Sequence, residues 1–194
     1  MTALELLGPD PEHAGAITAV HPGDGIAGTR EAAILHEVLM GAQDNLTNVL
    51  AIMLGVSIGA GRADLVALAG ASAAVAEAVS MGGVLYSATR AARLTRGPGR
   101  EAVPGQLSPM GSGVVTFAAA LVAGIVPLVP FAVVPLAAAV ACSAAISLVA
   151  LFALGSWTGR IGGAVWWRDG VRMLIVGAIA AVAAATVGSL MRVA

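Results

Sequence analysis

The sequence has few charged and few aromatic residues for its length. Of its 194 residues, 11% are charged and 4% are aromatic, while 58% are hydrophobic. A soluble domain carries about 25% charged residues, so this chain has too few to cover a water-facing surface. Its apolar residues are mainly Ala, Val, Leu and Ile, which suits helices that pack closely in lipid. These scarcities argue against an ordinary soluble domain and predict an integral membrane protein.

Lysine is absent and cysteine occurs once. All ten basic residues are arginines and the formal net charge is −1. The chain therefore lacks the excess of positive charge that is typical of proteins that bind nucleic acids. The single cysteine, Cys142, excludes an internal disulfide framework and any multi-cysteine metal site. Because Cys142 lies in an apolar run, we expect it to be a small buried side chain.

The motifs of common enzymes are also missing. The chain has no phosphate-binding glycine loop, no H-E-x-x-H motif, no nucleophile elbow and no acid pair with hydrolase spacing. We therefore expect neither catalysis nor a resident cofactor. Residues 1–30 lack the basic start and apolar core of a cleavable signal peptide, and they predict a mobile cytoplasmic tail.

Residues 31–194 predict one all-α membrane domain with five transmembrane helices. A bilayer core needs about 20 mostly apolar residues per helix. Five segments qualify, at about Ile34–Ala60, Leu65–Ala88, Gly113–Pro130, Phe131–Trp157 and Val171–Met191. The third and fourth spans are separated only by the PLVPF region, where two prolines predict a tight turn. Short gaps of this kind make sequence neighbours antiparallel neighbours in space.

The arginines predict the orientation of these spans. Eight of the ten fall on one predicted side: Arg30, Arg90, Arg93, Arg96, Arg100, Arg160, Arg168 and Arg172. Only Arg62 and Arg192 fall on the other side. Cytoplasmic loops carry the excess of arginine, so the N-terminus is expected in the cytoplasm and the C-terminus outside. Trp157, Trp166 and Trp167 fall near the inner boundary, where amphipathic rings settle.

Two acids, Asp44 and Glu77, lie well inside apolar sequence. Each costs about 2.5–3.5 kcal/mol at a helix centre on insertion scales, so such acids are functional by default. Asn48 lies one turn after Asp44, and Met81 lies one turn after Glu77, each pair on one helix face. Carboxylate and amide oxygens suit Mn(II) and Fe(II), and a thioether discriminates against Ca(II) and Mg(II). These residues predict a path for a divalent transition metal.

Structural roles remain open for the same residues. Asp44 could cap its helix or pair with an arginine, Glu77 could be structural, and Met81 could fill the core. His36 and Glu37, at the cytoplasmic end of the first span, are a candidate site of metal uptake or a solvated interfacial pair. The pairs Gly55-x-x-x-Gly59 and Gly155-x-x-x-Gly159 permit close contact between helices.

Several segments resemble a known family of transporters. TREAAILHEVLMGAQDNLTNVLAIMLGVSIGAG resembles the first helix of the vacuolar iron transporter family, and LVALAGASAAVAEAVSMGG is similar to its second helix. AAALVAGIVPLVPF resembles the third helix and its Pro-rich turn, and SLVALFALGSWTGR with RMLIVGAIAAVAAATVGSLM resembles the last two. The resemblance covers roughly Arg30 to Arg192, in matching order and spacing.

The resemblance implies a five-span protomer that forms a homodimer, with the metal path between the first helices. It implies export of Fe(II), and often Mn(II), from the cytosol in exchange for protons. Asp44 matches the transport aspartate of the family and Met81 its pathway methionine, whereas Glu77 matches no family motif. For a short, prokaryote-like member, the resemblance implies a multi-pass protein of the bacterial plasma membrane, with lipid as its surroundings.

The sequence also departs from the family. Asn45 replaces the usual glycine after the aspartate, and Val84-Leu85 replaces a Gly-Glu pair. The long glutamate-rich insert that some members carry between helices two and three is missing, and the connection here contains one acid, Glu101. Two other functions therefore stay open beside metal export: a metal-independent membrane scaffold, and a proton-coupled exporter of small solutes that uses Asp44 and Glu77.

Overall fold

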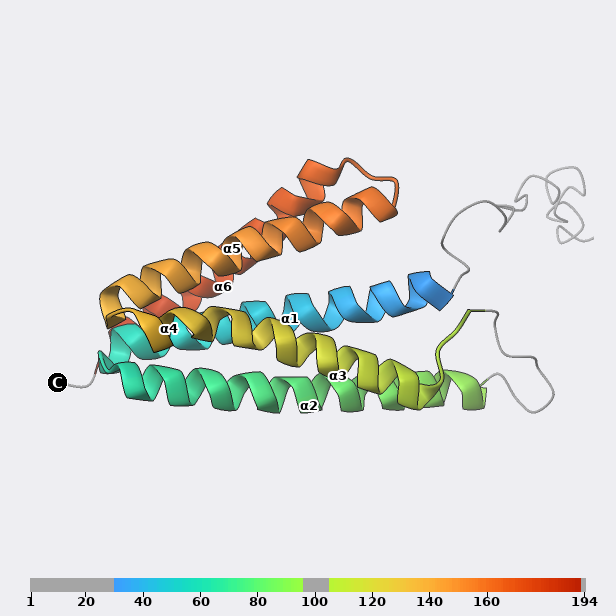
Figure 1. Ribbon diagram of the computed structural model, residues 1–194, viewed down its shortest axis with the longest axis horizontal. Helices are drawn as coiled ribbons and strands as arrows, with labels where there is room; N and C mark the ends of the chain where they lie inside the picture. Colours follow the sequence, from blue (N-terminus) through green and yellow to red (C-terminus); the bar gives the residue numbers. More distant parts are fainter. Residues whose placement is uncertain (1–29, 96–104, 193–194) are drawn as a thin grey trace, which may run out of the picture.

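The described part of the chain is built from helices. The computed structural model describes residues 30–95 and 105–192, so the predicted tail up to residue 29 and loop residues 96–104 lie outside it. The described elements are α1 (Arg30–Ala60), α2 (Ala63–Thr95), α3 (Pro109–Ile125), the 3-10 turn η2 (Val126–Leu128), α4 (Val129–Val133), α5 (Leu136–Ile161) and α6 (Trp166–Leu190) (Figure 1). The predicted all-α fold is confirmed for these residues.

Four helical stretches are long and apolar enough to cross a membrane. Among the described residues these are Ala63–Thr95, Pro109–Val133, Leu136–Ile161 and Trp166–Leu190. Helix α1 has 31 residues but is not one of them. Its hydropathy is lowered by His36, Glu37 and the polar residues between Gln43 and Asn48. The crossing of α1 therefore remains a prediction, supported by its position in the bundle.

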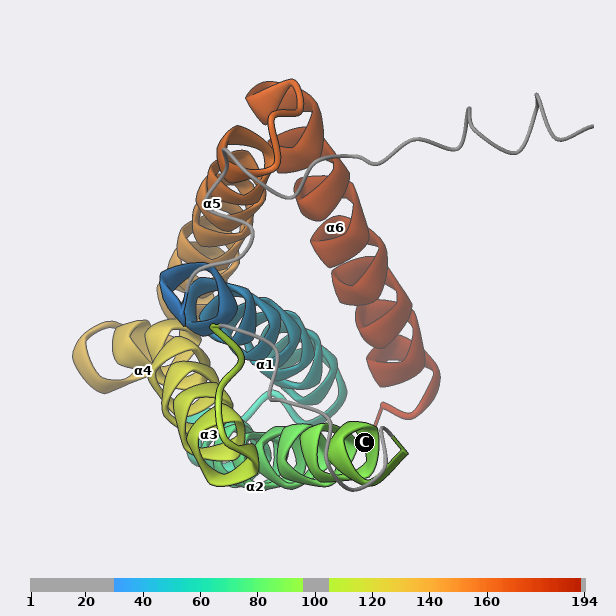
Figure 2. The same ribbon diagram turned by 90° about the vertical axis from the view of Figure 1, so that its right-hand side faces the viewer.

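Helix α1 lies at the centre of the bundle. The end-on view places α1 between the α2–α3 pair on one side and the α5–α6 pair on the other (Figure 2). It packs against all four of these helices. Its side chains Leu46, Val49, Leu50 and Met53 are at most 1% exposed. Because lipid is as apolar as leucine, close van der Waals packing is what stabilises such contacts in a membrane.

Both small-residue pairs predicted from the sequence lie at helix contacts. Gly55 and Gly59 of α1 face α6, where a methyl group at Gly59 would lie 3.2 Å from the carbonyl oxygen of Gly188. A methyl group at Gly155 of α5 would lie 2.6 Å from the carbonyl oxygen of Asp169 on α6. The expectation of close helix contact at both pairs is confirmed.

The turn between the third and fourth predicted spans comes later than expected. Pro127 and Pro130 lie in the first two positions of η2 and α4, where a missing N–H needs no partner inside the helix. The chain stays helical to Val133 and reverses at Val134, which is extended as expected for a residue before proline. Phe131 thus belongs to the third stretch, and α5 begins at Leu136 instead of Phe131.

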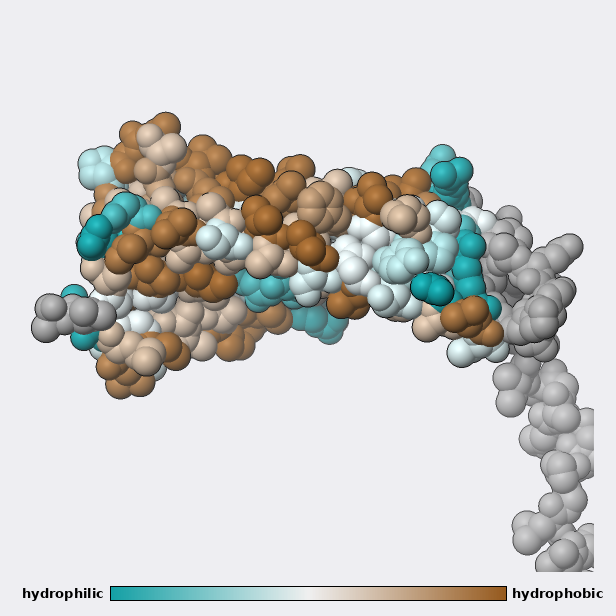
Figure 3. Space-filling view, turned by 90° about the horizontal axis from the view of Figure 1, so that it is seen from below, coloured by the Kyte–Doolittle hydropathy of each residue, from teal (hydrophilic) through white to brown (hydrophobic). Residues whose placement is uncertain are grey.

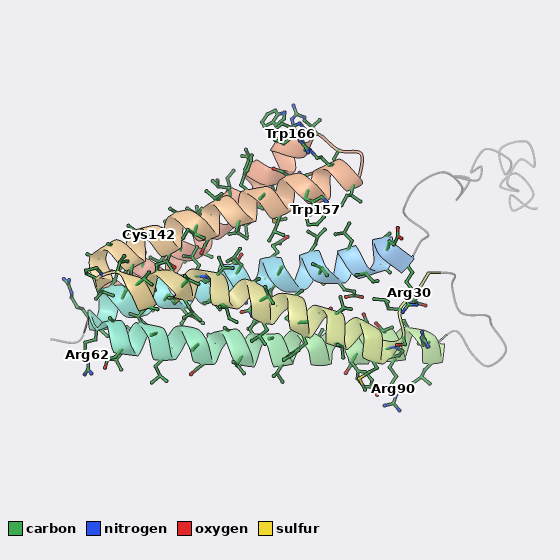
Figure 4. The ribbon with its side chains drawn as sticks, in the orientation of Figure 1. Arg30, Arg62, Arg90, Cys142, Trp157 and Trp166 are labelled. Atoms are coloured by element: carbon green, nitrogen blue, oxygen red, sulfur yellow. The ribbon has the colours of Figure 1, made fainter. Side chains whose placement is uncertain are left out.

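Arginines gather at one end of the described bundle. Arg30 begins α1, Arg90 and Arg93 lie in the last turns of α2 instead of the predicted loop, and Arg160, Arg168 and Arg172 flank the connection from α5 to α6. Arg62 and Arg192 lie at the opposite end (Figure 4 labels Arg30, Arg90 and Arg62). The side of the membrane that each end faces remains a prediction.

Cys142 of α5 is exposed, so the expectation of a buried thiol is wrong. The buried row of α5 contains Ala139, Ser143, Ser147 and Leu151, which recur every four residues. Cys142 lies one position before this row and therefore on the outer face of the helix.

Candidate functional site

One face of α1 is polar at mid-helix. Gln43, Asp44 and Asn48 are partly exposed, whereas Asn45 between them is buried. Seen from below, the molecule has hydrophilic surface part-way along its length, between apolar regions (Figure 3). In an otherwise apolar bundle, polar groups in such a position are a candidate path for a polar solute or ion.

A carboxylate from α2 meets this face. The side chain of Glu77 interacts with the carboxyl group of Asp44 and with the side-chain amide of Asn48. We call Asp44, Asn48 and Glu77 the carboxylate cluster. Two negatively charged carboxylates that interact repel each other, and a cation bound between them would relieve this repulsion. The structure thus brings together three of the four predicted path residues.

Met81 lies one turn beyond Glu77 on α2 and is partly buried. Because α2 runs from the Arg62 end toward the Arg90 end, Met81 is nearer than Glu77 to the arginine-rich end. An ion that arrived from that end would pass the level of Met81 before it reached Glu77. The role of Met81 as a ligand stays a prediction.

Glu37 and His36 lie in different surroundings. The carboxylate of Glu37 accepts hydrogen bonds from two hydroxyls of α3, one from Ser112 and one from Thr116 at 3.1 Å. His36 is exposed. Glu37 precedes Asp44 by seven residues, two turns or about 10.5 Å along the helix, on the same face. The proposed uptake role of either residue stays a prediction.

The sequence reasoning did not identify the partners of Glu37. Ser112 and Thr116 are buried, and they lie four residues apart in an apolar helix. That spacing puts two hydroxyls on one helix face. It was the only feature of the sequence that indicated a pair of hydrogen-bond donors on α3. It could not show that the face turns toward α1.

Asn45 connects three helices beside the carboxylate cluster. Its side-chain Nδ2 donates to the carbonyl oxygen of Ala74 on α2 at 3.0 Å and to that of Ala120 on α3 at 2.8 Å. A methyl group at Gly124 of α3 would lie 2.8 Å from this nitrogen, so the glycine leaves room for the amide. The departure from the family glycine at position 45 is thus accommodated by the packing of α1, α2 and α3.

The described residues of the chain do not by themselves form a complete metal site. Among residues 30–95 and 105–192, no three His, Cys, Asp or Glu side chains gather closely enough to hold a metal ion. The carboxylate cluster offers two carboxylates and one amide. A transition metal bound there would need further ligands, from Met81, water or a second protomer.

A comparison with known families matches residues 92–189 to the VIT family. The matched region covers just over half of the chain, from the end of α2 through nearly all of α6. It does not include α1 or the carboxylate cluster. No curated protein matches the sequence.

Proposed function

The chain belongs to the VIT family of membrane transporters, and from this premise we propose that it exports Fe(II), Mn(II) or both from the cytosol in exchange for protons. Family membership supports a multi-pass membrane protein that transports metal ions, and not an enzyme. The metal, the direction and the exchange with protons are our proposal.

The contact of Glu77 with Asp44 and Asn48 is the observation that carries the proposal. A pair of carboxylates in apolar surroundings holds a divalent cation well when both are deprotonated and releases it when protons return. Competition between metal and protons at one site is the chemistry that an exchanger needs. The carboxylate cluster offers a site for this competition, and its oxygen ligands suit Mn(II) and Fe(II).

We propose that the ion follows the polar face of α1. From the arginine-rich end, it would pass Glu37, then the level of Met81, and then reach Asp44, Glu77 and Asn48. A second copy, related by a two-fold axis, would add its own carboxylates and complete the ligand set.

Flux of Fe(II) and Mn(II) into proteoliposomes tests the proposal. Glu77→Gln keeps the size of the side chain but removes its charge, so we expect at least a roughly tenfold loss of metal flux. Glu31→Gln, at an exposed position of the first turn of α1, is the matched control and should transport like the wild type.

The same assay separates the other two functions. A scaffold would show no metal flux even as wild type. A solute exporter would lose proton flux in Glu77→Gln without any dependence on metal. Wild-type flux in Glu77→Gln, at equal protein content, would contradict the assignment of the carboxylate cluster.

A further inference from the structure

Both carboxylate oxygens of Glu37 are occupied by hydroxyl groups of α3. One oxygen accepts a hydrogen bond from Ser112, and the other accepts one from Thr116 at 3.1 Å. Ser112 and Thr116 are buried, and Glu37 is partly buried. Because both hydroxyls donate to the carboxylate, a cation that approached it from α3 would first have to displace two hydrogen atoms. The side of Glu37 that faces α3 is therefore closed to a metal ion.

Glu37 is the first of three contacts that α1 makes with α3 at intervals of one turn. Gly41 is the second, where a methyl group would lie 2.6 Å from the carbonyl oxygen of Thr116. Asn45 is the third and donates to the carbonyl oxygen of Ala120 at 2.8 Å. Residues four apart share a helix face, so these contacts join one face of α1 to α3. Together they fix the distance between the two helices and the rotation of α1 about its axis.

The contact at Glu37 lies in a part of α1 that has fewer neighbours. Helices α5 and α6 diverge from α1 toward the arginine-rich end (Figure 1). The close contacts of α1 with α6 are further along the helix, at Gly55 and Gly59. A carboxylate forms stronger hydrogen bonds than a neutral acceptor does. The two hydrogen bonds of Glu37 therefore hold this end of α1 on the α2–α3 pair.

We propose that Glu37 is a positioning residue, which fixes the rotation of α1 through its two contacts with α3. Asp44 follows Glu37 by two turns on the same face of α1. A rotation of α1 that breaks the contacts with α3 therefore also turns Asp44 away from Glu77. The transported ion passes the level of Glu37 without binding to it. This role presupposes the proposed transport of a metal ion through the carboxylate cluster.

Removal of the two hydroxyls tests this role without changing Glu37. In the double variant Ser112→Ala with Thr116→Val, the carboxylate loses both donors. We expect the concentration of Fe(II) or Mn(II) that gives half-maximal flux into proteoliposomes to rise about tenfold, the lower end of the effect of removing an outer partner of a metal ligand. The matched control is Thr186→Val with Ser189→Ala, whose hydroxyls donate to carbonyl oxygens of α6 itself. This control should leave the half-saturating concentration unchanged.

Glu37→Gln separates positioning from metal binding. The amide oxygen of glutamine accepts from one hydroxyl, and its NH₂ group donates to the oxygen of the other, so both contacts with α3 can persist. We expect the half-saturating metal concentration of this variant to equal that of the wild type. A residue that bound the ion through its charge would instead lose flux, as expected for Glu77→Gln.

A double-mutant cycle on the thermal unfolding of the purified full-length protein gives a measurement that does not depend on transport. Glu37→Ala, added to the double variant without hydroxyls, should lower the unfolding midpoint no further, because the carboxylate that had lost its partners is then gone. Additive shifts of the midpoint would overturn the proposal. So would a lowered midpoint with an unchanged half-saturating concentration, because the contact would then be structural only.

Two further results would also contradict the positioning role. One is loss of flux in Glu37→Gln with normal flux in the double variant, since Glu37 would then bind the ion. The other is a wild type without metal flux, which would refute the proposed function itself, and the positioning role with it, even if the unfolding cycle confirmed the contact.

Discussion

Asp44 can be altered in two ways that separate its charge from its geometry. Asp44→Asn keeps the size but removes the titrating group, so metal flux should fall by at least about tenfold. Asp44→Glu keeps the titration but moves the oxygens by roughly 1.5 Å, beyond the ~0.2 Å tolerance of metal–ligand distances, and should retain partial flux.

Flux of Fe(II) and Mn(II) in expression-matched proteoliposomes measures both variants. Asp64→Asn, at an exposed residue paired with Arg62, is the control and should transport normally. A capping aspartate would give the reverse order, because Asn is often a good cap and Glu is longer. Full transport by Asp44→Asn would mean that Asp44 is structural.

Asn45 and Asn48 are neighbours in sequence with different expected roles. Asn45→Ala removes two hydrogen bonds between helices, and we expect it to lower the free energy of unfolding by about 1–2 kcal/mol. Asn48→Ala removes a partner of Glu77 and should reduce metal flux with little change in stability.

Thermal unfolding and metal flux of the two alanine variants, measured side by side, test this division. Each variant is the control of the other. If Asn45→Ala reduced flux more than Asn48→Ala while its unfolding midpoint stayed unchanged, the assignment of the two amides would have to be exchanged.

Among the elements, α1 has a face that another protomer could contact. Val49, Leu50 and Met53 are at most 1% exposed, whereas Ile52 is 40% exposed and Ala51 is partly exposed. If two protomers meet along α1, single cysteines at positions 51 and 52 should form disulfides between copies, and those at 49, 50 and 53 should not. The native Cys142 is exposed and must first be replaced by serine.

Crosslinked dimers on gels, for protein in native membranes, provide the measurement. Uniform crosslinking at buried and exposed positions would indicate unfolded protein instead of an interface. No crosslinking at any position of the α1 face, in folded protein, would exclude this mode of dimerisation.

The contact between α1 and α6 depends on a glycine. A methyl group at Gly188 would collide with the backbone of Gly55, whereas one at Gly83 of α2 would meet nothing within 4 Å. We expect Gly188→Ala to cost about 1–3 kcal/mol of stability through overpacking. Gly83→Ala should be neutral or slightly stabilising because alanine favours the helix. Thermal unfolding of both variants checks this, and equal midpoints would contradict the contact.

Some of these elements were predictable and others were not. The length of the apolar runs predicted five long helices, and three acid and amide positions, Asp44, Asn48 and Glu77, predicted a polar region on α1 and α2. The turn at Pro127 and Pro130 was misplaced because proline is compatible with the start of a new helical turn. The contacts of Glu37 with Ser112 and Thr116 depend on how α3 rotates against α1, which no local pattern encodes.

For the whole molecule, the clustering of arginines predicts the orientation in the membrane. Six arginines of the described residues lie at one end and two at the other. The positive-inside rule then puts the α2–α3 loop in the cytoplasm and the C-terminus outside. Reporter fusions at Arg100 and Ala194 should report opposite sides. Finding both on one side would refute three membrane crossings between Arg100 and Ala194.

The modest hydropathy of α1 has a consequence for biosynthesis. The translocon releases a segment into lipid according to its apolarity, and Asp at a helix centre is penalised by about 2.5–3.5 kcal/mol. Helix α1 emerges from the ribosome first, before the helices that will surround it. Its lateral release should therefore wait for α2, so that the two enter the bilayer together as a hairpin. In a glycosylation-based insertion assay, α1 alone should integrate poorly, and α1 followed by α2 should integrate efficiently.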